Sequence, residues 1–256
     1  MEYNSSKTMK KLAFILFFFT QLLAAQSAFD RGNEQYRKGQ YQEAVQSYES
    51  IMKQGKESAE VYFNLGNAYY KLNEVAPAIY NYEKALLLKP NDRDIQTNLG
   101  YAQNMVIDDI QAVPKVGFSK LFYGLVGTYH YDTWAWIAIG FAFGVLLFFT
   151  GYYFAGTTLL KRLFFVAMFI SLFVVGVSIM SAVFVKSQSS KMRPAIVFNE
   201  VVSVKSERLN NAPDAFILHE GTKVNVTEEL DNWKKIELAD ENVGWIQSSA
   251  IKELKD

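Results

Sequence analysis

Hydrophobic and polar residues follow three different patterns along this chain of 256 residues. Residues 26–112 mix apolar and polar positions at helical spacing, and the spacing recurs at a fixed interval. Two long runs, 133–155 and 163–185, contain no charged residue. After residue 194, apolar and polar residues alternate in short stretches, which is the period of β-strands. The patterns predict a multidomain membrane protein with an all-α region, two long apolar helices and a small all-β domain.

The all-α region contains an internal repeat. Gly32, Gly66 and Gly100 follow one another at equal intervals. The same register also holds matched pairs: Asn33 with Asn67, Tyr36 with Tyr70, Ala44 with Ala78 and Tyr48 with Tyr82. A period of about 34 residues, with small and large residues in fixed positions, is typical of tetratricopeptide repeats, in which two antiparallel helices form each unit. We interpret this region as a tetratricopeptide solenoid.

Two complete units, 26–59 and 60–93, and a closing helix, 94–112, fit this register. The glycines are expected where the first helix of a unit approaches the second helix closely, since a side chain there would force the helices apart. Tyr48 and Tyr82 are expected to fill the wider gap between neighbouring units. An unrelated helical bundle is the alternative, and three glycines in one register argue against it.

The chain begins with a pattern typical of an export signal. Lys7, Lys10 and Lys11 precede the apolar run Leu12–Leu23, and two alanines follow that run. The layout predicts a signal peptide over residues 1–25. An uncleaved N-terminal anchor is the alternative. In either case the repeats that follow are exported.

The two uncharged runs predict membrane helices. A helix as long as either run extends about 34 Å, and the hydrocarbon core of a bilayer is about 30 Å thick. We therefore predict spans over 133–155 and 163–185, with a cytoplasmic turn at 156–162 and a linker at 186–194. Gly140 and Gly144 are expected to let the spans approach closely. Apolar residues at helical spacing in 113–132 predict an amphipathic segment on the membrane surface, in contact with lipid.

The charges around the spans favour opposite orientations. Lys161 and Arg162 favour a cytoplasmic turn, whereas Lys186, Lys191 and Arg193 at the other end count against it. The export signal decides between them, because an exported N-terminal region forces the turn to lie inside. The prediction is an inner-membrane protein of a Gram-negative cell with both soluble regions in the periplasm.

The C-terminal region, 195–256, resembles bacterial SH3-like domains. The stretches that carry the resemblance are LHEGTKVNV (218–226), NWKKI (232–236) and VGWI (243–246). The resemblance implies a small β-barrel whose ligand surface includes Trp233 and Trp245. In the stretch 202–213, the Gly and the Arg of the pattern that usually lines the ligand groove are missing from their motif positions, which argues against wall-peptide binding.

Composition restricts the chemistry. The chain has no cysteine, which excludes disulfides and thiol catalysis, and its formal net charge is zero, which gives no general attraction to nucleic acid. The two histidines, His130 and His219, lie in separate regions with no metal-ligand spacing around them, and no phosphate-binding glycine loop is present. We expect no cofactor, no metal, no nucleic-acid partner and no enzymatic activity.

Binding of a protein partner remains as the expected activity. The first helices of tetratricopeptide units line the inner wall of the array. The register places these residues on that wall: Phe29, Asn33, Tyr36, Phe63, Asn67, Tyr70, Tyr101 and Asn104. Asparagine amides can hold a peptide backbone through a paired donor and acceptor. The alternative is that these residues only stabilise the repeats.

The predicted groove resembles the carboxylate-clamp tetratricopeptide domains only in part. Asn33 and Asn64 match the two asparagines of that motif, whereas Phe29, Asp94 and Asn98 occupy its three basic positions. Binding of a free C-terminal carboxylate is therefore not expected.

The order of the parts resembles the aerotolerance proteins of the BatE family in Bacteroidetes, over nearly the whole chain. The resemblance implies a scaffold in an assembly with von Willebrand A-domain membrane proteins and a MoxR-type ATPase, linked to oxidative or envelope stress. The alternative function is a cell-wall sensor that binds peptidoglycan through the SH3-like domain.

Overall fold

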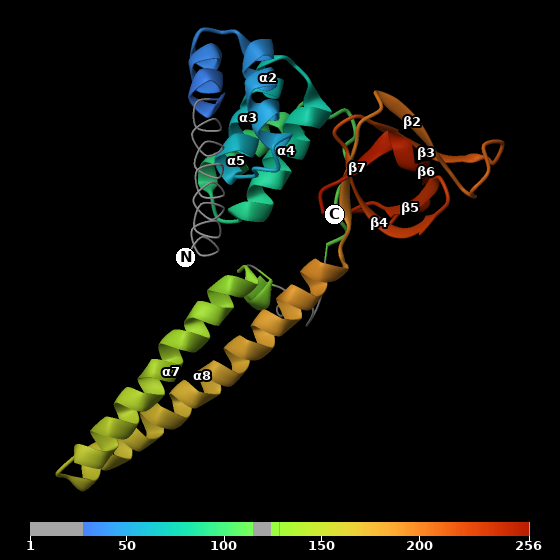
Figure 1. Cartoon of the computed structure of the whole chain (residues 1–256). Coiled ribbons are helices and arrows are strands. Elements are labelled where there is room, and N and C mark those ends of the chain that lie inside the picture. The colour runs from blue at the N-terminus through green and yellow to red at the C-terminus, as the bar shows by residue number, and fades with distance from the viewer. Residues whose placement is uncertain (1–27, 115–123, 128, 256) are drawn as a thin grey trace, which may run out of the picture. The chain divides into compact units, whose positions relative to one another are not determined.

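The computed structural model describes residues 28–114, 124–127 and 129–255. The predicted signal peptide, and much of the predicted interfacial segment, lie outside these residues. The described chain forms two compact units (Figure 1). The first combines the residues up to Gln111 with those from Pro194 onward, and the second is Ala112–Arg193.

The repeats form pairs of antiparallel helices, as the register predicts. They comprise a helix over residues 28–37, α2 (Tyr41–Met52), α3 (Ala59–Lys71), α4 (Val75–Leu88) and α5 (Arg93–Gln103). Side chains cap two of the first helices: Ser58 accepts a hydrogen bond from the backbone of Val61, and Asp92 accepts from that of Ile95.

The closing helix is shorter than the predicted 94–112, because α5 ends at Gln103. The residues that follow pack elsewhere in the same unit. Val106 packs against the core of the repeats, Asp108 binds the turn after strand β3 (Asp214–His219), and Ile110 packs against the sheet core. These contacts need an extended backbone, which is the physical reason why the helix stops.

Two of the three glycines mark close helix contacts. A Cβ on Gly32 would lie 2.5 Å from the Tyr48 ring, and one on Gly66 would lie 2.8 Å from the Tyr82 ring. Tyr48 and Tyr82 therefore cover the glycine of their own unit, and Tyr48 also belongs to a core cluster that includes Val61 and Leu65 of the next unit. Gly100 has no neighbour within 4 Å, since no second helix follows α5 in the described repeats.

The C-terminal region folds into an antiparallel sheet of seven strands in the order β3-β2-β6-β5-β4-β1-β7. Its other strands are β1 (Pro194–Val197), β2 (Val201–Lys205), β4 (Lys223–Leu230), β5 (Trp233–Glu237), β6 (Val243–Gln247) and β7 (Ile251–Glu253). The core of the sheet is built from Val204, Val226, Ile236 and Ile246, all fully buried. The strand pairing leaves β3 and β7 as the two ends, so the predicted barrel is not closed by hydrogen bonds.

The sheet packs against the repeats instead of forming a separate domain. Ile196 of β1 and Leu254, which follows β7, are buried in the same apolar core as Val75 and Ile79 of α4. Gly221 has a φ of 84°, and a Cβ there would lie within about 3 Å of side chains from the repeats. The region before the apolar helices and the region after them therefore share one core.

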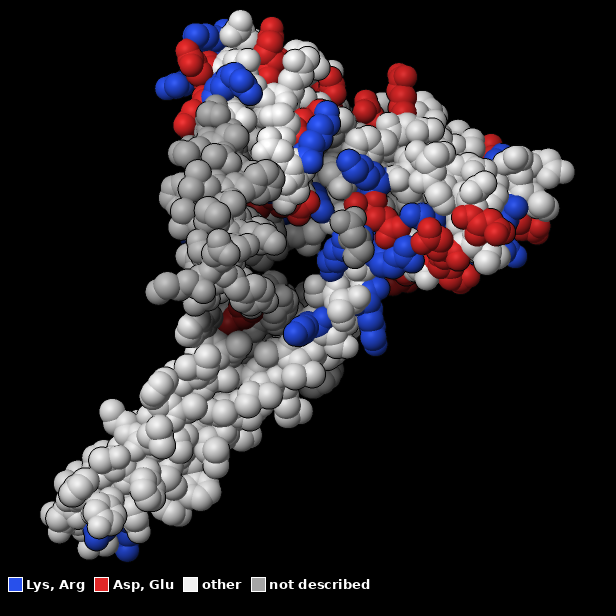
Figure 2. Space-filling model, viewed as in Figure 1, with Lys and Arg blue, Asp and Glu red and all other residues white. Residues whose placement is uncertain are grey.

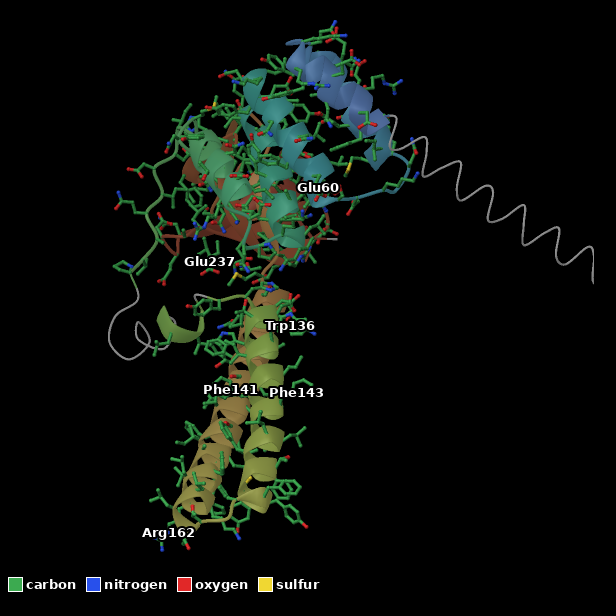
Figure 3. The ribbon with its side chains drawn as sticks, turned by 90° about the vertical axis from the view of Figure 1, so that its left-hand side faces the viewer. Glu60, Trp136, Phe141, Phe143, Arg162 and Glu237 are labelled. Atoms are coloured by element: carbon green, nitrogen blue, oxygen red, sulfur yellow. The ribbon has the colours of Figure 1, made fainter. Side chains whose placement is uncertain are left out.

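The second unit is a helical hairpin. Helices α7 (Tyr131–Phe154) and α8 (Thr158–Lys191) lie side by side along their length (Figures 1 and 3) and are long and apolar enough to cross a membrane. Their surface is almost free of charge between the two ends (Figure 2). Trp136, Phe141 and Phe143 project from α7 (Figure 3), and Trp136 is 71% exposed.

The hairpin differs from the prediction in two respects. Helix α8 continues through Lys191 and begins at Thr158, so it includes residues expected in the linker and in the turn. Gly140 has no neighbour within 4 Å and is not a packing residue. The close contacts involve Gly144, next to Ser171, and Gly151, next to the Phe164 ring, because these positions face the partner helix.

Candidate functional site: the groove of the repeats

A groove runs along the first helices of the repeats. A hollow of about 1030 Å³ is lined by Asp30, Arg31, Asn33, Glu34, Tyr36, Arg37, Tyr48, Asn64 and Asn67. A second hollow of about 250 Å³ is lined by Tyr36, Asn67, Tyr70, Lys71, Tyr82, Asn98 and Tyr101. Tyr36 and Asn67 belong to both hollows, so we treat the two as one surface and call it the groove.

A repeated hydrogen-bond network forms the floor of the groove. In the first repeat, the Tyr48 hydroxyl donates to Asn33 Oδ1 at 2.8 Å, and Asn64 Nδ2 donates to the same oxygen at 2.9 Å. The asparagine oxygen thus connects the first helix of its unit to the second helix of that unit and to the first helix of the next.

The second repeat contains the same network at the equivalent positions. The Tyr82 hydroxyl donates to Asn67 Oδ1 at 2.7 Å, and Asn98 Nδ2 donates to that oxygen at 2.9 Å. A carbonyl oxygen has two lone pairs, and both are used here. The predicted paired donor and acceptor for a peptide backbone is therefore incomplete, because Asn33 and Asn67 retain only their Nδ2 donors for a ligand.

The buried tyrosines of this network remain protonated. Burial raises the pKa of Tyr48 to about 12, and the nearby Tyr36 adds to the shift. Burial also raises the pKa of Tyr82. Both hydroxyls therefore act as donors over the whole physiological pH range, and the network does not change with pH there.

Five of the predicted residues lie together in the groove: Asn33, Tyr36, Asn67, Tyr70 and Tyr101. Phe29 and Phe63 are not among the lining residues. Their rings pack at 6.0 Å from the rings of Tyr48 and Tyr82 and so support the floor. Asn104 is the C-cap of α5 and is exposed outside the groove lining.

The prediction missed the charged residues of the groove lining, which are Asp30, Arg31, Glu34, Arg37 and Lys71. Arg37 and Lys71 are a matched pair among them. They occupy the same position of successive repeats, so the register contained the signal. Both follow a groove tyrosine directly, and this position lies on the exposed side of the first helix.

A further hollow, which does not belong to the groove, lies on the sheet. It has a volume of about 640 Å³ and is lined by residues that include Trp233, Trp245, Arg208 and Leu230. Lys235 Nζ and the Arg208 guanidinium lie 5.9 Å and 5.3 Å from the centre of the Trp245 ring. The two predicted tryptophans are thus half-buried and share one concave surface, which we call the tryptophan hollow.

The junction between the sheet and the repeats contains a partly buried carboxylate, that of Asp108. Asp108 Oδ2 accepts hydrogen bonds from the backbone of His219 at 2.7 Å and from the Thr222 hydroxyl at 2.5 Å. His219 Nδ1 lies 2.7 Å from Asp108 Oδ1. Nearby, Lys223 of β4 pairs with the buried Glu83 of α4 at 2.7 Å. Within the described residues, no cluster of three potential metal ligands occurs at this junction or elsewhere.

Comparison with known protein families identifies the helical part. Residues 59–92 match the family model described as tetratricopeptide repeat, and residues 32–73 match one described as TPR repeat. These helices are tetratricopeptide repeats. The matches cover less than half of the chain, so they identify this region and not the hairpin or the sheet. No curated protein matches the chain.

Proposed function

We propose that this chain is a membrane-anchored scaffold, without enzymatic activity, that holds a protein partner in the groove of its tetratricopeptide repeats. Repeats of this kind generally bind proteins. The observation that carries the proposal is that the two faces of the repeats have different surroundings. The sheet covers α4, a second helix, whereas the groove on the first helices is lined, among the described residues, by residues of the repeats alone.

The hairpin supplies the anchor in this proposal. Leu147, Phe173 and Met180 are more than 60% exposed, and such a surface is stable only in lipid or against another apolar surface. Two crossings return the chain to the side from which it started. The shared core of the regions before and after the hairpin supports this topology, because both regions must then lie on the same side.

The outer side is the proposed location of both regions. The basic start and the apolar run before Ala24 support export. In this proposal the repeats and the sheet lie in the periplasm, and Lys161 and Arg162 lie in the cytoplasm. By its resemblance to the BatE family, we propose that the partners are von Willebrand A-domain membrane proteins and a MoxR-type ATPase system, and that the assembly acts in oxidative or envelope stress.

Site-specific photo-crosslinking in cells tests the scaffold. A photoreactive residue in place of Tyr70 would lie in the groove, whereas one in place of Gln46, exposed on α2, would lie outside its lining. We expect a defined partner to be captured from position 70 and not from position 46. Equal capture at both positions, or none at position 70, would contradict the proposal.

A second function is favoured by the tryptophan hollow. In this alternative the sheet acts as a bacterial SH3-like domain and binds peptidoglycan through Trp233 and Trp245. Aromatic rings beside cationic and amide groups suit sugar faces and peptide stems. The test is co-sedimentation of the purified full chain with sacculi. Trp245→Ala should abolish retention of the protein by the sacculi. Thr227→Ala, at an exposed position of β4, should leave retention unchanged. If the wild type is not retained, or if neither change affects retention, the alternative is excluded.

A further inference from the structure

The groove carries one cation per repeat in the same register. Arg37 follows Tyr36, and Lys71 follows the equivalent Tyr70. Arg37 lines the larger hollow, and Lys71 lines the smaller one. Because the helices of successive repeats stack with the same orientation, the two cations form a row along one wall of the groove.

Neither cation of this row forms an ion pair with a carboxylate among the described residues. Lys38, the neighbour of Arg37, shows the contrast: its Nζ lies 2.6 Å from Glu34 Oε1, and this hydrogen bond lowers the pKa of Glu34. Glu34, three positions before Arg37, is therefore already paired with Lys38, and the charge of Arg37 makes only a smaller contribution to the lowering of its pKa. The smaller hollow is lined by Lys71 and by uncharged residues only.

The remaining charges lie at one end of the groove. Arg31 Nε donates to Ser47 Oγ at 3.3 Å and is held by the fold. Asp30 is at the register position of Asn64 and lines only the larger hollow. From Tyr36 to Tyr101 the lining of the smaller hollow thus has positive charge and hydroxyl and amide groups, but no carboxylate among the described residues.

We propose that the groove binds an extended acidic segment of a partner protein, with aspartate or glutamate side chains facing Arg37 and Lys71. The tyrosine hydroxyls at positions 36, 70 and 101 and the Nδ2 donors of Asn33 and Asn67 supply further hydrogen bonds. Lysine and arginine form stronger hydrogen bonds with an ionised partner than with a neutral one. This inference rests on the proposed scaffold function and adds the chemical class of the ligand.

The segment is internal to its partner, not a free C-terminus. The positions that hold a terminal carboxylate in the carboxylate-clamp domains are Phe29, Asp94 and Asn98 here, which provide no positive charge. The row at Arg37 and Lys71 is spaced by one repeat and can contact two side-chain carboxylates of one extended segment at the same time.

Peptide binding to the full chain in detergent micelles tests the inference. The probe is a fluorescent, end-blocked peptide of about twelve residues in which Glu alternates with Pro, and its control has Gln in place of Glu. We expect the Glu peptide to bind at least about tenfold more tightly than the Gln peptide at low salt, and the difference to shrink as salt is added. Equal binding of both peptides, or no binding of the Glu peptide, would overturn the inference.

Charge-reversal variants locate the binding. Arg37→Glu with Lys71→Glu should reduce binding of the Glu peptide at least about tenfold. Lys53→Glu, at the end of α2 and outside the groove lining, makes the same kind of charge change and should leave it unaltered. Similar losses in both proteins would mean nonspecific attraction and would overturn the inference. If crosslinking from position 70 captures a partner while the Glu peptide fails to bind, the scaffold stands and the acidic ligand is wrong.

Discussion

Asp108 and His219 are joined by contacts to both the backbone and the ring of the histidine, although they are 111 residues apart in sequence. The two apolar helices lie between them in the chain. Their contact joins the repeats and the sheet in one folded unit. If the hairpin crosses a membrane, as we propose, this unit can form only with both regions on the same side. The central claim of the account follows from this relationship.

Loss of the Asp108 carboxylate should weaken the junction. Asp108→Ala leaves the Thr222 hydroxyl and the His219 backbone without their acceptor at a site where the aspartate side chain is only 11% exposed. We expect the free energy of unfolding to fall by about 1–3 kcal/mol. Asp109→Ala is the matched control, since Asp109 is exposed. Denaturant unfolding of both purified proteins measures the difference, and equal stability would show that the junction does not hold the unit together.

The Asp108 carboxylate should also make the free energy of unfolding depend on pH in the acidic range. Burial raises the pKa of Asp108, but hydrogen bonds from Thr222 and His219 and the charge of His219 outweigh burial, so the pKa lies below its ordinary value of 3.8. A folded pKa below the unfolded one means that the contribution is complete above the unfolded pKa and is lost as pH falls through the folded pKa.

We therefore expect the wild type to lose more stability than Asp108→Asn when the pH is lowered below about 4. Thermal unfolding across a pH series checks this prediction. Parallel curves for the two proteins would refute it.

Two glycines of the repeat register should respond differently to the same change. In Gly66→Ala the new methyl would lie 2.8 Å from the Tyr82 ring, and we expect a loss of about 1–3 kcal/mol from overpacking. In Gly100→Ala the methyl meets no neighbour within 4 Å, and the better helix propensity of alanine should leave stability unchanged or raise it by up to about 1 kcal/mol. Equal effects in an unfolding titration would contradict the packing described for the repeats.

Alanine substitutions at two groove residues should affect stability and partner binding differently. Asn67→Ala removes the acceptor of the Tyr82 hydroxyl and of Asn98, so we expect a loss of about 1–3 kcal/mol in stability together with weaker partner binding. Tyr70→Ala should weaken partner binding with a smaller effect on stability, because Tyr70 is only half-buried. Unfolding and co-purification of the partner, measured on both variants, test the separation. An Asn67→Ala protein as stable as the wild type would contradict the network.

The parts of this fold that arise from local pattern could be predicted from the sequence. The register of Gly32 and Gly66 predicted the helix pairs, because a close helix contact needs a small residue at a fixed position. Uncharged runs predicted the hairpin. The predicted end of the closing helix was wrong, because the residues after Gln103 pack against the repeats and the sheet, and no local pattern encodes those contacts.

The junction between the sheet and the repeats could not be predicted, because no local pattern encodes it. Asp108 and Asp109 are adjacent carboxylates, and nothing in their immediate sequence distinguishes the partly buried one from the exposed one. In the groove, Asn33 and Asn67 are among the lining residues. Their use as internal acceptors depends on Tyr48 and Tyr82 from the second helices, and these contacts appear only in the folded repeats.

The absence of cysteine from the chain permits the most direct test of the central claim. Single cysteines in place of Gln46, before the hairpin, Gly156, in its turn, and Thr227, after it, can be labelled in intact spheroplasts with a membrane-impermeant maleimide. The account predicts that positions 46 and 227 react and that position 156 reacts only after the membrane is opened. Labelling of positions 46 and 227 from opposite sides of the membrane would contradict it.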